Sequence, residues 1–103
     1  MTKDELAKIA QVADKKKINA ELKRLGYCDC KRHKEYKNIG FDVLFKGDLI
    51  ETVEYSDANG KQRYQGGIFT NVNNYENLEF IIININDDKN TFPIDMLIWA
   101  KEL

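Results

Sequence analysis

The sequence predicts an α+β domain, in which one or two N-terminal helices pack on an antiparallel sheet of four or five strands. The first 26 residues place apolar side chains at helical spacing and end on a glycine. From residue 39 onward, short alternating or apolar runs are separated by asparagine, aspartate and glycine, which is typical of strands and turns. A chain of 103 residues has the ordinary size of one domain. We therefore expect a single domain over residues 1–103, with a helical part (1–26), a connecting segment (27–38) and a sheet (39–103).

Two helices are predicted in the N-terminal part. Thr2 and Glu5 have the spacing of a capping box, which satisfies the free amides at the start of a helix. Two sets of apolar residues follow at helical spacing, namely Leu6, Ile9, Ala10 and Ala13, and then Ile18, Leu22 and Leu25. Because these sets are out of phase on one continuous helix, we expect a break near Asp14, which can cap a second helix. Gly26 stands where that helix would end.

Five strands are predicted in the C-terminal part, at residues 39–45, 49–55, 62–72, 78–86 and 92–99. The fourth has the longest apolar run, and we expect it at the centre of the sheet. Asn59-Gly60 is a strong hairpin signal, and Asn73-Asn74 and residues 87–90 mark two further turns.

The ends and bends of these strands leave two alternatives open. Pro93 places the start of the last strand at an edge or in an irregular segment, and residues 94–103 are also compatible with a short helix. Gly66 and Gly67 allow a sharp bend in the third strand. A small, strongly curved SH3-like barrel is therefore the main variant of the open sheet.

The connecting segment holds both cysteines and the single histidine of the chain, Cys28, Cys30 and His33. Thiolate sulfur and imidazole nitrogen are ligands that Zn²⁺ takes in tetrahedral sites, and we predict that these three residues bind a structural zinc ion. The fourth ligand would be water, a group of a neighbouring chain or a nearby carboxylate, of which the sequence offers Asp29, Glu35 and Asp42. The spacing matches no familiar zinc-finger signature. The alternative is two half-buried thiols beside a surface histidine.

The sequence predicts a cytoplasmic, non-enzymatic protein. No apolar run approaches the length of a membrane span, and the N-terminal sequence lacks the layout of a signal peptide. We therefore expect reduced cysteines, and Lys31 and Arg32 beside them should favour the thiolate that zinc requires. The sequence lacks the motifs of serine hydrolases, P-loop proteins and dinucleotide-binding enzymes, which predicts no catalytic activity.

DNA binding is one of two functions that the charge distribution favours. Residues 1–46 contain 12 Lys and Arg against 7 Asp and Glu, whereas residues 47–103 contain 4 against 10. Lys15, Lys16 and Lys17 begin the second predicted helix, and the apolar spacing around them resembles a helix-turn-helix. In this alternative, a small accessory protein contacts DNA phosphates through these lysines.

Protein binding is the second function, and it is the one that we favour. The acidic half offers candidates for contact with a basic, nucleic-acid-handling protein, namely Glu51, Glu54, Asp57, Glu76, Asp87 and Asp88. Complementary charge speeds association and selects the partner, and aromatic side chains contribute much of the binding energy at interfaces. The tyrosines among these acids therefore fit the same role.

The chain also resembles a known group of proteins. In its size, its Lys-, Asn- and Ile-rich composition, its cysteine–histidine window at 28–33 and its lack of enzyme motifs, it is similar to small phage-encoded anti-CRISPR proteins that inhibit Cas9. Some members of that group are compact α+β domains held by zinc, and the window at 28–33 would fit such a site. The resemblance implies a protein in the bacterial host cell that binds a Cas9-type nuclease directly. It also implies blocked nucleic-acid loading, with carboxylates where phosphates would lie.

Overall fold

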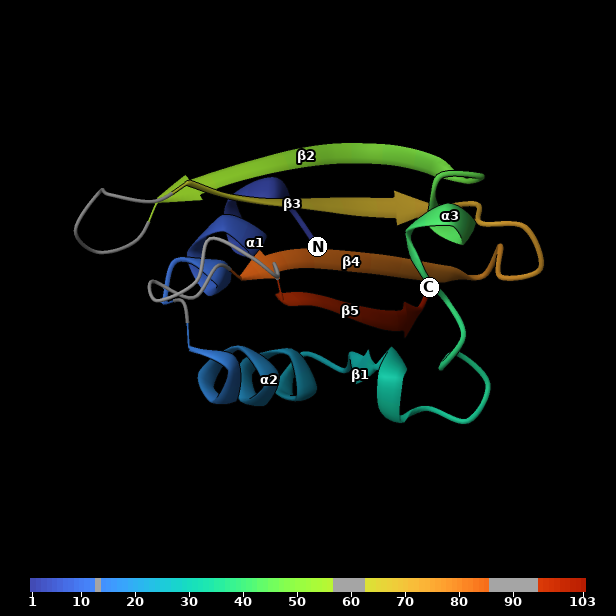
Figure 1. The fold of residues 1–103 in the computed structure, drawn as a ribbon, viewed down its shortest axis with the longest axis horizontal. Helices are drawn as coiled ribbons and strands as arrows, with labels where there is room; N and C mark the ends of the chain where they lie inside the picture. Colours follow the sequence, from blue (N-terminus) through green and yellow to red (C-terminus); the bar gives the residue numbers. More distant parts are fainter. Residues whose placement is uncertain (13, 57–62, 86–94) are drawn as a thin grey trace.

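The computed structural model describes residues 1–12, 14–56, 63–85 and 95–103. The described helices are α1 (Lys3–Ala10), α2 (Lys15–Arg24) and the short α3 (Phe41–Leu44), with a 3₁₀ turn, η1 (Cys30–Arg32). The described strands are β1 (Cys28–Asp29), β2 (Asp48–Ser56), β3 (Arg63–Thr70), β4 (Leu78–Ile85) and β5 (Asp95–Glu102). They form one antiparallel sheet in the order β1-β5-β4-β3-β2 (Figure 1). The predicted α+β fold is confirmed.

The sheet is open, and the variant of a strongly curved SH3-like barrel is wrong. β1 forms one edge and β2 forms the other, and Figure 1 shows them on opposite sides of the sheet. β3 continues through Gly66 and Gly67, each of which pairs with a residue of β2 and a residue of β4. The two glycines therefore lie inside a regular strand and do not bring the edges together.

The ends of the two long helices are those that the sequence predicts. The Thr2 side chain accepts a hydrogen bond from the Glu5 amide in a complete capping box. The Asp14 side chain accepts hydrogen bonds from the amides of Lys16 and Lys17, so it caps α2. Gly26 follows α2 with a φ of 95°, a left-handed conformation in which a side chain is strained. The break between the helices therefore comes from local side-chain chemistry.

α1 and α2 cover one face of the sheet. The buried side chains in this layer are Leu6, Ala10, Ile18, Leu22, Tyr27, Val53, Ile68, Ile81, Ile83, Leu97 and Trp99. Trp99 Nε1 donates a hydrogen bond to Asn19 Oδ1 at 3.1 Å, which joins α2 to β5. The apolar faces that the sequence assigns to the two helices are thus directed at the sheet.

The segment from η1 to α3 covers part of the opposite face. Its buried residues Cys30, Ile39 and Leu44 belong to a second core cluster with Phe69, Val72, Leu78, Phe80, Ile82, Ile98 and Ala100. β4 contributes alternate side chains to both clusters and is the middle strand of the five. Its continuous apolar run is therefore explained by burial on both faces, as predicted.

The strand predicted at residues 39–45 is wrong, because this segment forms α3. Leu44 is fully buried, and Phe41, one turn earlier, packs against the second core cluster. The amides of Val43 and Leu44 donate hydrogen bonds to the Gly40 carbonyl, which begins the helical turn. A short apolar run fits either a strand or one turn of a buried helix, and only packing against the sheet decides between them.

The C-terminal segment is a strand, and the helix considered for residues 94–103 is wrong. β5 pairs with β4 over eight residue pairs, from Leu78↔Glu102 to Ile85↔Asp95. On its other side it pairs with β1, a strand of two residues that the sequence does not predict. Asn73-Asn74 forms a turn as predicted, with Asn74 at a φ of 72°. The turns predicted at Asn59-Gly60 and at residues 87–90 lie outside the described residues. Within the described residues, no helix has the length and apolar character needed to cross a membrane.

Candidate functional site

The cysteine–histidine segment lies at the β1 edge of the sheet. Cys28 is half-buried, and its Sγ donates a hydrogen bond to the Ala100 carbonyl at 3.4 Å. Cys30 is 1% exposed and packs in the second core cluster. The His33 ring stacks on Tyr36 with 4.1 Å between centroids, and its Nδ1 accepts a hydrogen bond from the Glu35 amide at 3.2 Å. The three side chains are thus engaged with different neighbours.

This arrangement does not gather the predicted zinc ligands. Cys28 and His33 line a common pocket of about 360 Å³, whereas Cys30 is not among the residues that line it. Among the described residues, no three His, Cys, Asp or Glu side chains lie together as a metal site. Burial raises the pKa of Cys28, and it raises the pKa of Cys30 to about 12, so both favour the thiol. As the side chains lie, they do not fit a zinc ion, and zinc binding stays a prediction from the sequence.

The lysines of the DNA-binding alternative occupy the first turn of α2. Lys15, Lys16 and Lys17 are all exposed. Asn19, two residues after them on the same helix, accepts a hydrogen bond from the Trp99 indole. One face of α2 is buried against the sheet. A recognition helix enters the major groove with its exposed face, so only the exposed face of α2 is available for such a contact. The three lysines therefore supply positive charge, but the side-chain amide of Asn19 beside them is used in a contact with β5.

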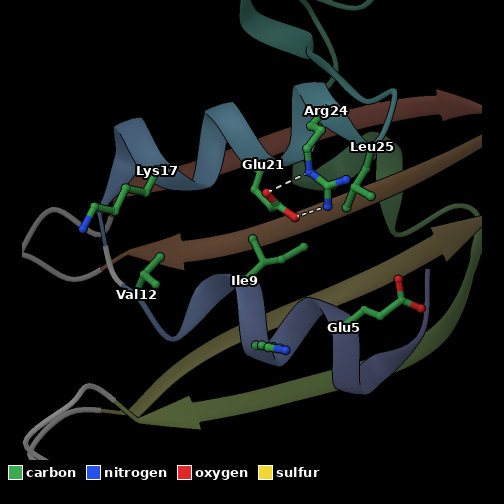
Figure 2. Close-up of a pocket in the computed structure, with 8 residues that line it drawn as sticks. Glu5, Ile9, Val12, Lys17, Glu21, Arg24 and Leu25 are labelled. Carbon is green, nitrogen blue, oxygen red and sulfur yellow. Dashed lines mark hydrogen bonds and ion pairs between the residues drawn. The ribbon is translucent and has the colours of Figure 1, made fainter.

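A groove between α1 and α2 has a mixed character. It measures about 430 Å³ and has the apolar side chains of Ile9, Val12 and Leu25 along its length. Figure 2 shows Glu21 and Arg24 paired above it and Ile9 and Val12 pointing into the space between the helices. Its lining contains Glu5 and Glu21 as well as three basic side chains, so it presents no single sign of charge. This distribution selects no class of ligand.

The predicted partner-binding acids do not form one cluster in the described structure. Glu51 and Glu54 are exposed on β2. Glu76 is exposed in the turn between β3 and β4, where its Oε1 accepts a hydrogen bond from the Asn74 amide at 3.3 Å. Asp57, Asp87 and Asp88 lie outside the described residues. Glu51 and Glu54 share one regular strand, and because they are three residues apart their side chains point to opposite faces of the sheet.

Exposed apolar side chains precede these two acids along the chain. Phe45 is 67% exposed, Leu49 is 50% exposed and Ile50 is 55% exposed. Ile50 has no partner on β3 because the register shifts between Leu49 and Glu51, which is a β-bulge. We call the five residues Phe45, Leu49, Ile50, Glu51 and Glu54 the β2 surface. Large apolar side chains gathered on a surface and bordered by charge are typical of protein-binding sites.

An apolar groove adjoins the β2 surface on the face that α3 covers. It measures about 240 Å³ and is lined by Phe41, Phe45, Leu49, Thr52, Gly66, Gly67, Phe69, Ile82 and Asn84. We call it the Phe41 groove. The Phe41 and Phe45 rings stack with 5.2 Å between centroids, and Phe45 meets the Phe69 ring edge-on at 6.2 Å. Aromatic walls of this kind suit an apolar side chain from a partner.

Gly67 keeps the Phe41 groove open. A Cβ atom at this position would lie 3.2 Å from Phe69 Cε2 and 3.3 Å from Leu49 Cδ1. A side chain at Gly67 would therefore fill the space between two walls of the groove. Gly67, at which the sequence predicts a bend, instead leaves a hollow between the side chains of Phe69 and Leu49.

Sequence reasoning identified the acids of the β2 surface and missed its apolar part. The sequence predicts a strand at residues 39–45, and this prediction does not reveal the exposure of Phe45 at the end of α3. The neighbouring apolar residues Leu49 and Ile50 break the alternation of β2, and that break is the signal of a bulge that could have revealed them. Comparison of the chain with protein family models, with curated proteins and with solved structures found no match.

Proposed function

We propose that the protein is a non-enzymatic inhibitor that binds a basic, nucleic-acid-handling protein through the β2 surface. The observation that carries this proposal is the exposure of Phe45, Leu49 and Ile50 at the start of the same edge strand that carries exposed Glu51 and Glu54. Large apolar side chains supply affinity once they are removed from water. Carboxylates at the border steer a basic partner to the surface and disfavour acidic ones.

A Cas9-type nuclease is the most specific partner that we propose. Such a nuclease holds its nucleic acids in a positively charged channel, so it offers the basic surface that Glu51 and Glu54 would complement. The resemblance to anti-CRISPR proteins supports the same partner and implies that binding blocks nucleic-acid loading. The inhibitor would act by occupancy, with one molecule per nuclease and without turnover. Binding through the β2 surface does not require zinc, because β1 and β2 lie at opposite edges of the sheet.

Calorimetric titration of a purified Cas9-type nuclease, with and without its guide RNA, tests this proposal. We expect binding at one inhibitor per nuclease and loss of DNA cleavage that saturates at the same ratio. Leu49→Ala with Phe45→Ala should weaken binding by about tenfold or more at both low and high salt, because apolar contacts are not screened. Glu51→Lys with Glu54→Lys should weaken binding more at low salt than at high salt.

Glu35→Lys is the matched control for the charge reversals. Glu35 is exposed and follows β1 and η1, away from β2, so its reversal changes the net charge as much as one of the two reversals on β2 does, without altering the β2 surface. We expect this variant to bind the nuclease as the wild type does. Absence of binding to the nuclease in either state would refute the proposal, and so would inhibition of many nuclease molecules by one protein molecule.

A further inference from the structure

β2 offers a backbone edge that the other described strands leave open. It is the last strand in the sheet order and pairs only with β3 among the described strands. In Figure 1 no described element runs along its outer side. Residues 51–56 pair with β3 without a register shift, so this stretch is regular. Alternate N–H and C=O groups of a regular edge strand point away from the sheet and can pair with another extended chain.

The charge of β2 limits which chain can pair there. The strand contains Asp48, Glu51 and Glu54 and no lysine or arginine. The Asp48 carboxylate accepts a hydrogen bond from Asn71 Nδ2 at 2.9 Å, whereas Glu51 and Glu54 are exposed along the regular stretch. A neighbouring strand would place its side chains within reach of these two carboxylates. Cationic side chains would be attracted at those positions.

We propose that β2 accepts a basic, extended peptide segment of the partner protein as a sixth strand, with one apolar side chain of that segment in the Phe41 groove. This inference rests on the proposed function, because the segment belongs to the same basic partner. It adds the mode of binding, which is backbone pairing along residues 51–56. The bulge at Ile50 marks the end of the pairing, because it interrupts the regular ladder.

A second copy of this chain is a poor occupant of the same edge. Two β2 strands related by a twofold axis would bring two identical sets of acids together, with no base on either strand. Like charges on directly opposed strands are destabilising. The charge of β2 thus favours a basic segment over self-association.

The Phe41 groove lies where an added strand can reach it. Leu49 pairs with Phe69, and Thr52 pairs with Gly67, so Leu49 and Thr52 point to the face that holds the groove. Alternate side chains of an added strand would point to that same face beside them. A long apolar or aromatic side chain at one of these positions can therefore lie over Leu49 and enter the groove.

The test uses a synthetic eight-residue peptide in which lysine alternates with valine and one central valine is replaced by phenylalanine. The matched control has the same sequence with N-methyl groups on alternate backbone amides, which keeps the charge and side chains but removes edge pairing. NMR of the ¹⁵N-labelled protein follows amide shifts and hydrogen exchange, and titration gives the two affinities. We expect slower exchange of β2 amides and at least about tenfold weaker binding of the methylated peptide.

A double-mutant cycle tests the groove. Phe45→Ala in the protein and phenylalanine→alanine in the peptide should each weaken binding, and the two effects should not add, because they remove the same contact. Equal binding of the plain and methylated peptides would overturn strand addition and leave only charge attraction. Failure of the plain peptide to bind, or protection confined to the helices or β1, would also overturn it. Concentration-dependent dimers with protected β2 amides in the absence of peptide would identify a second copy as the occupant.

Nuclease binding separates this inference from the proposed function. If the nuclease binds and β2 amides exchange as in the free protein, the proposed function stands and strand addition is refuted. If the peptide pairs with β2 and the nuclease does not bind, strand addition stands and the choice of a nuclease is refuted.

Discussion

The hydroxyl group of Tyr27 donates a hydrogen bond to the carboxylate of Glu79, with 2.5 Å between Tyr27 Oη and Glu79 Oε1. Glu79 is 8% exposed and is the only buried charged side chain among the described residues. Its two carboxylate oxygens also accept hydrogen bonds from the Met1 ammonium group at 3.2 and 3.3 Å. The pair joins the segment after α2 to the central strand β4, and it compensates a charge that burial would otherwise penalise.

Tyr27→Phe should destabilise the fold. The substitution keeps the ring in the core but removes a donor from a buried carboxylate, which costs about 1.5–3 kcal/mol for a hydrogen bond to a charged group. The measurement is urea denaturation at pH 7. Tyr75→Phe is the matched control, because Tyr75 is half-buried and its side chain makes only ring contacts with the described residues, so its effect should stay below about 0.5 kcal/mol. Equal destabilisation by both variants would show that the hydroxyl of Tyr27 contributes no specific bond.

Stability should fall as the pH rises above about 9. Burial raises the pKa of Cys30 to about 12, and burial together with the Glu79 hydrogen bond raises the pKa of Tyr27. Above their ordinary pKa values both groups lose protons in the unfolded chain and keep them in the folded chain, so stability present at neutral pH is lost as the pH rises toward the folded-state values. The slope is at most about 1.4 kcal/mol per pH unit for each group.

Urea denaturation between pH 7 and pH 10.5 in reducing buffer measures this slope. Cys30→Ala lowers stability at every pH because it leaves a space in the core, but it should also flatten the alkaline part of the curve. Cys28→Ala is the companion variant, because Cys28 is only half-buried and should change the slope less. An unchanged alkaline slope in Cys30→Ala would show that the Cys30 thiol does not contribute to the loss of stability at high pH.

Zinc binding by Cys28, Cys30 and His33 requires Cys30 to leave the core. A measurement of bound zinc therefore tests this prediction directly. If the prediction from the sequence holds, protein purified without chelator contains close to one zinc ion per chain by elemental analysis. Chelator should then lower the melting temperature of the wild type but not of the Cys28→Ser, Cys30→Ser double variant, because a ligand bound to the folded state stabilises it by mass action. Absence of metal, with melting that chelator does not change, would leave two thiols beside a stacked histidine.

Duplex DNA binding is the test of the alternative function. We expect no shift of duplex DNA by the wild type at physiological salt, and therefore no difference when Lys15, Lys16 and Lys17 are replaced by alanine. Gel shifts over a range of salt concentrations measure this. A tight shift that weakens in the triple variant, with a flatter salt dependence, would favour DNA binding, because each lost phosphate contact reduces the number of released counterions.

Local side-chain chemistry determined much of the fold directly. The capping box at Thr2, the cap at Asp14 and the stop at Gly26 depend on interactions within a few residues, so the sequence alone predicts both long helices and the break between them. The continuous apolar run of β4 likewise predicts a central strand buried on both faces.

Tertiary packing decided the rest. Phe41–Leu44 became a helix because Leu44 and Phe41 pack on the sheet. β1 formed because Cys28 and Asp29 pair with the outer edge of β5. Cys28, Cys30 and His33 are neighbours in sequence, yet a two-residue strand and a 3₁₀ turn direct Cys30 into the core and the other two toward a surface pocket. The Phe41 groove also depends on packing, since Phe45, Leu49 and Phe69 line a common hollow only when α3 lies against the sheet. Local patterns report the chemistry of neighbouring residues, whereas a binding surface joins side chains from different elements, and their contact is determined by how those elements pack.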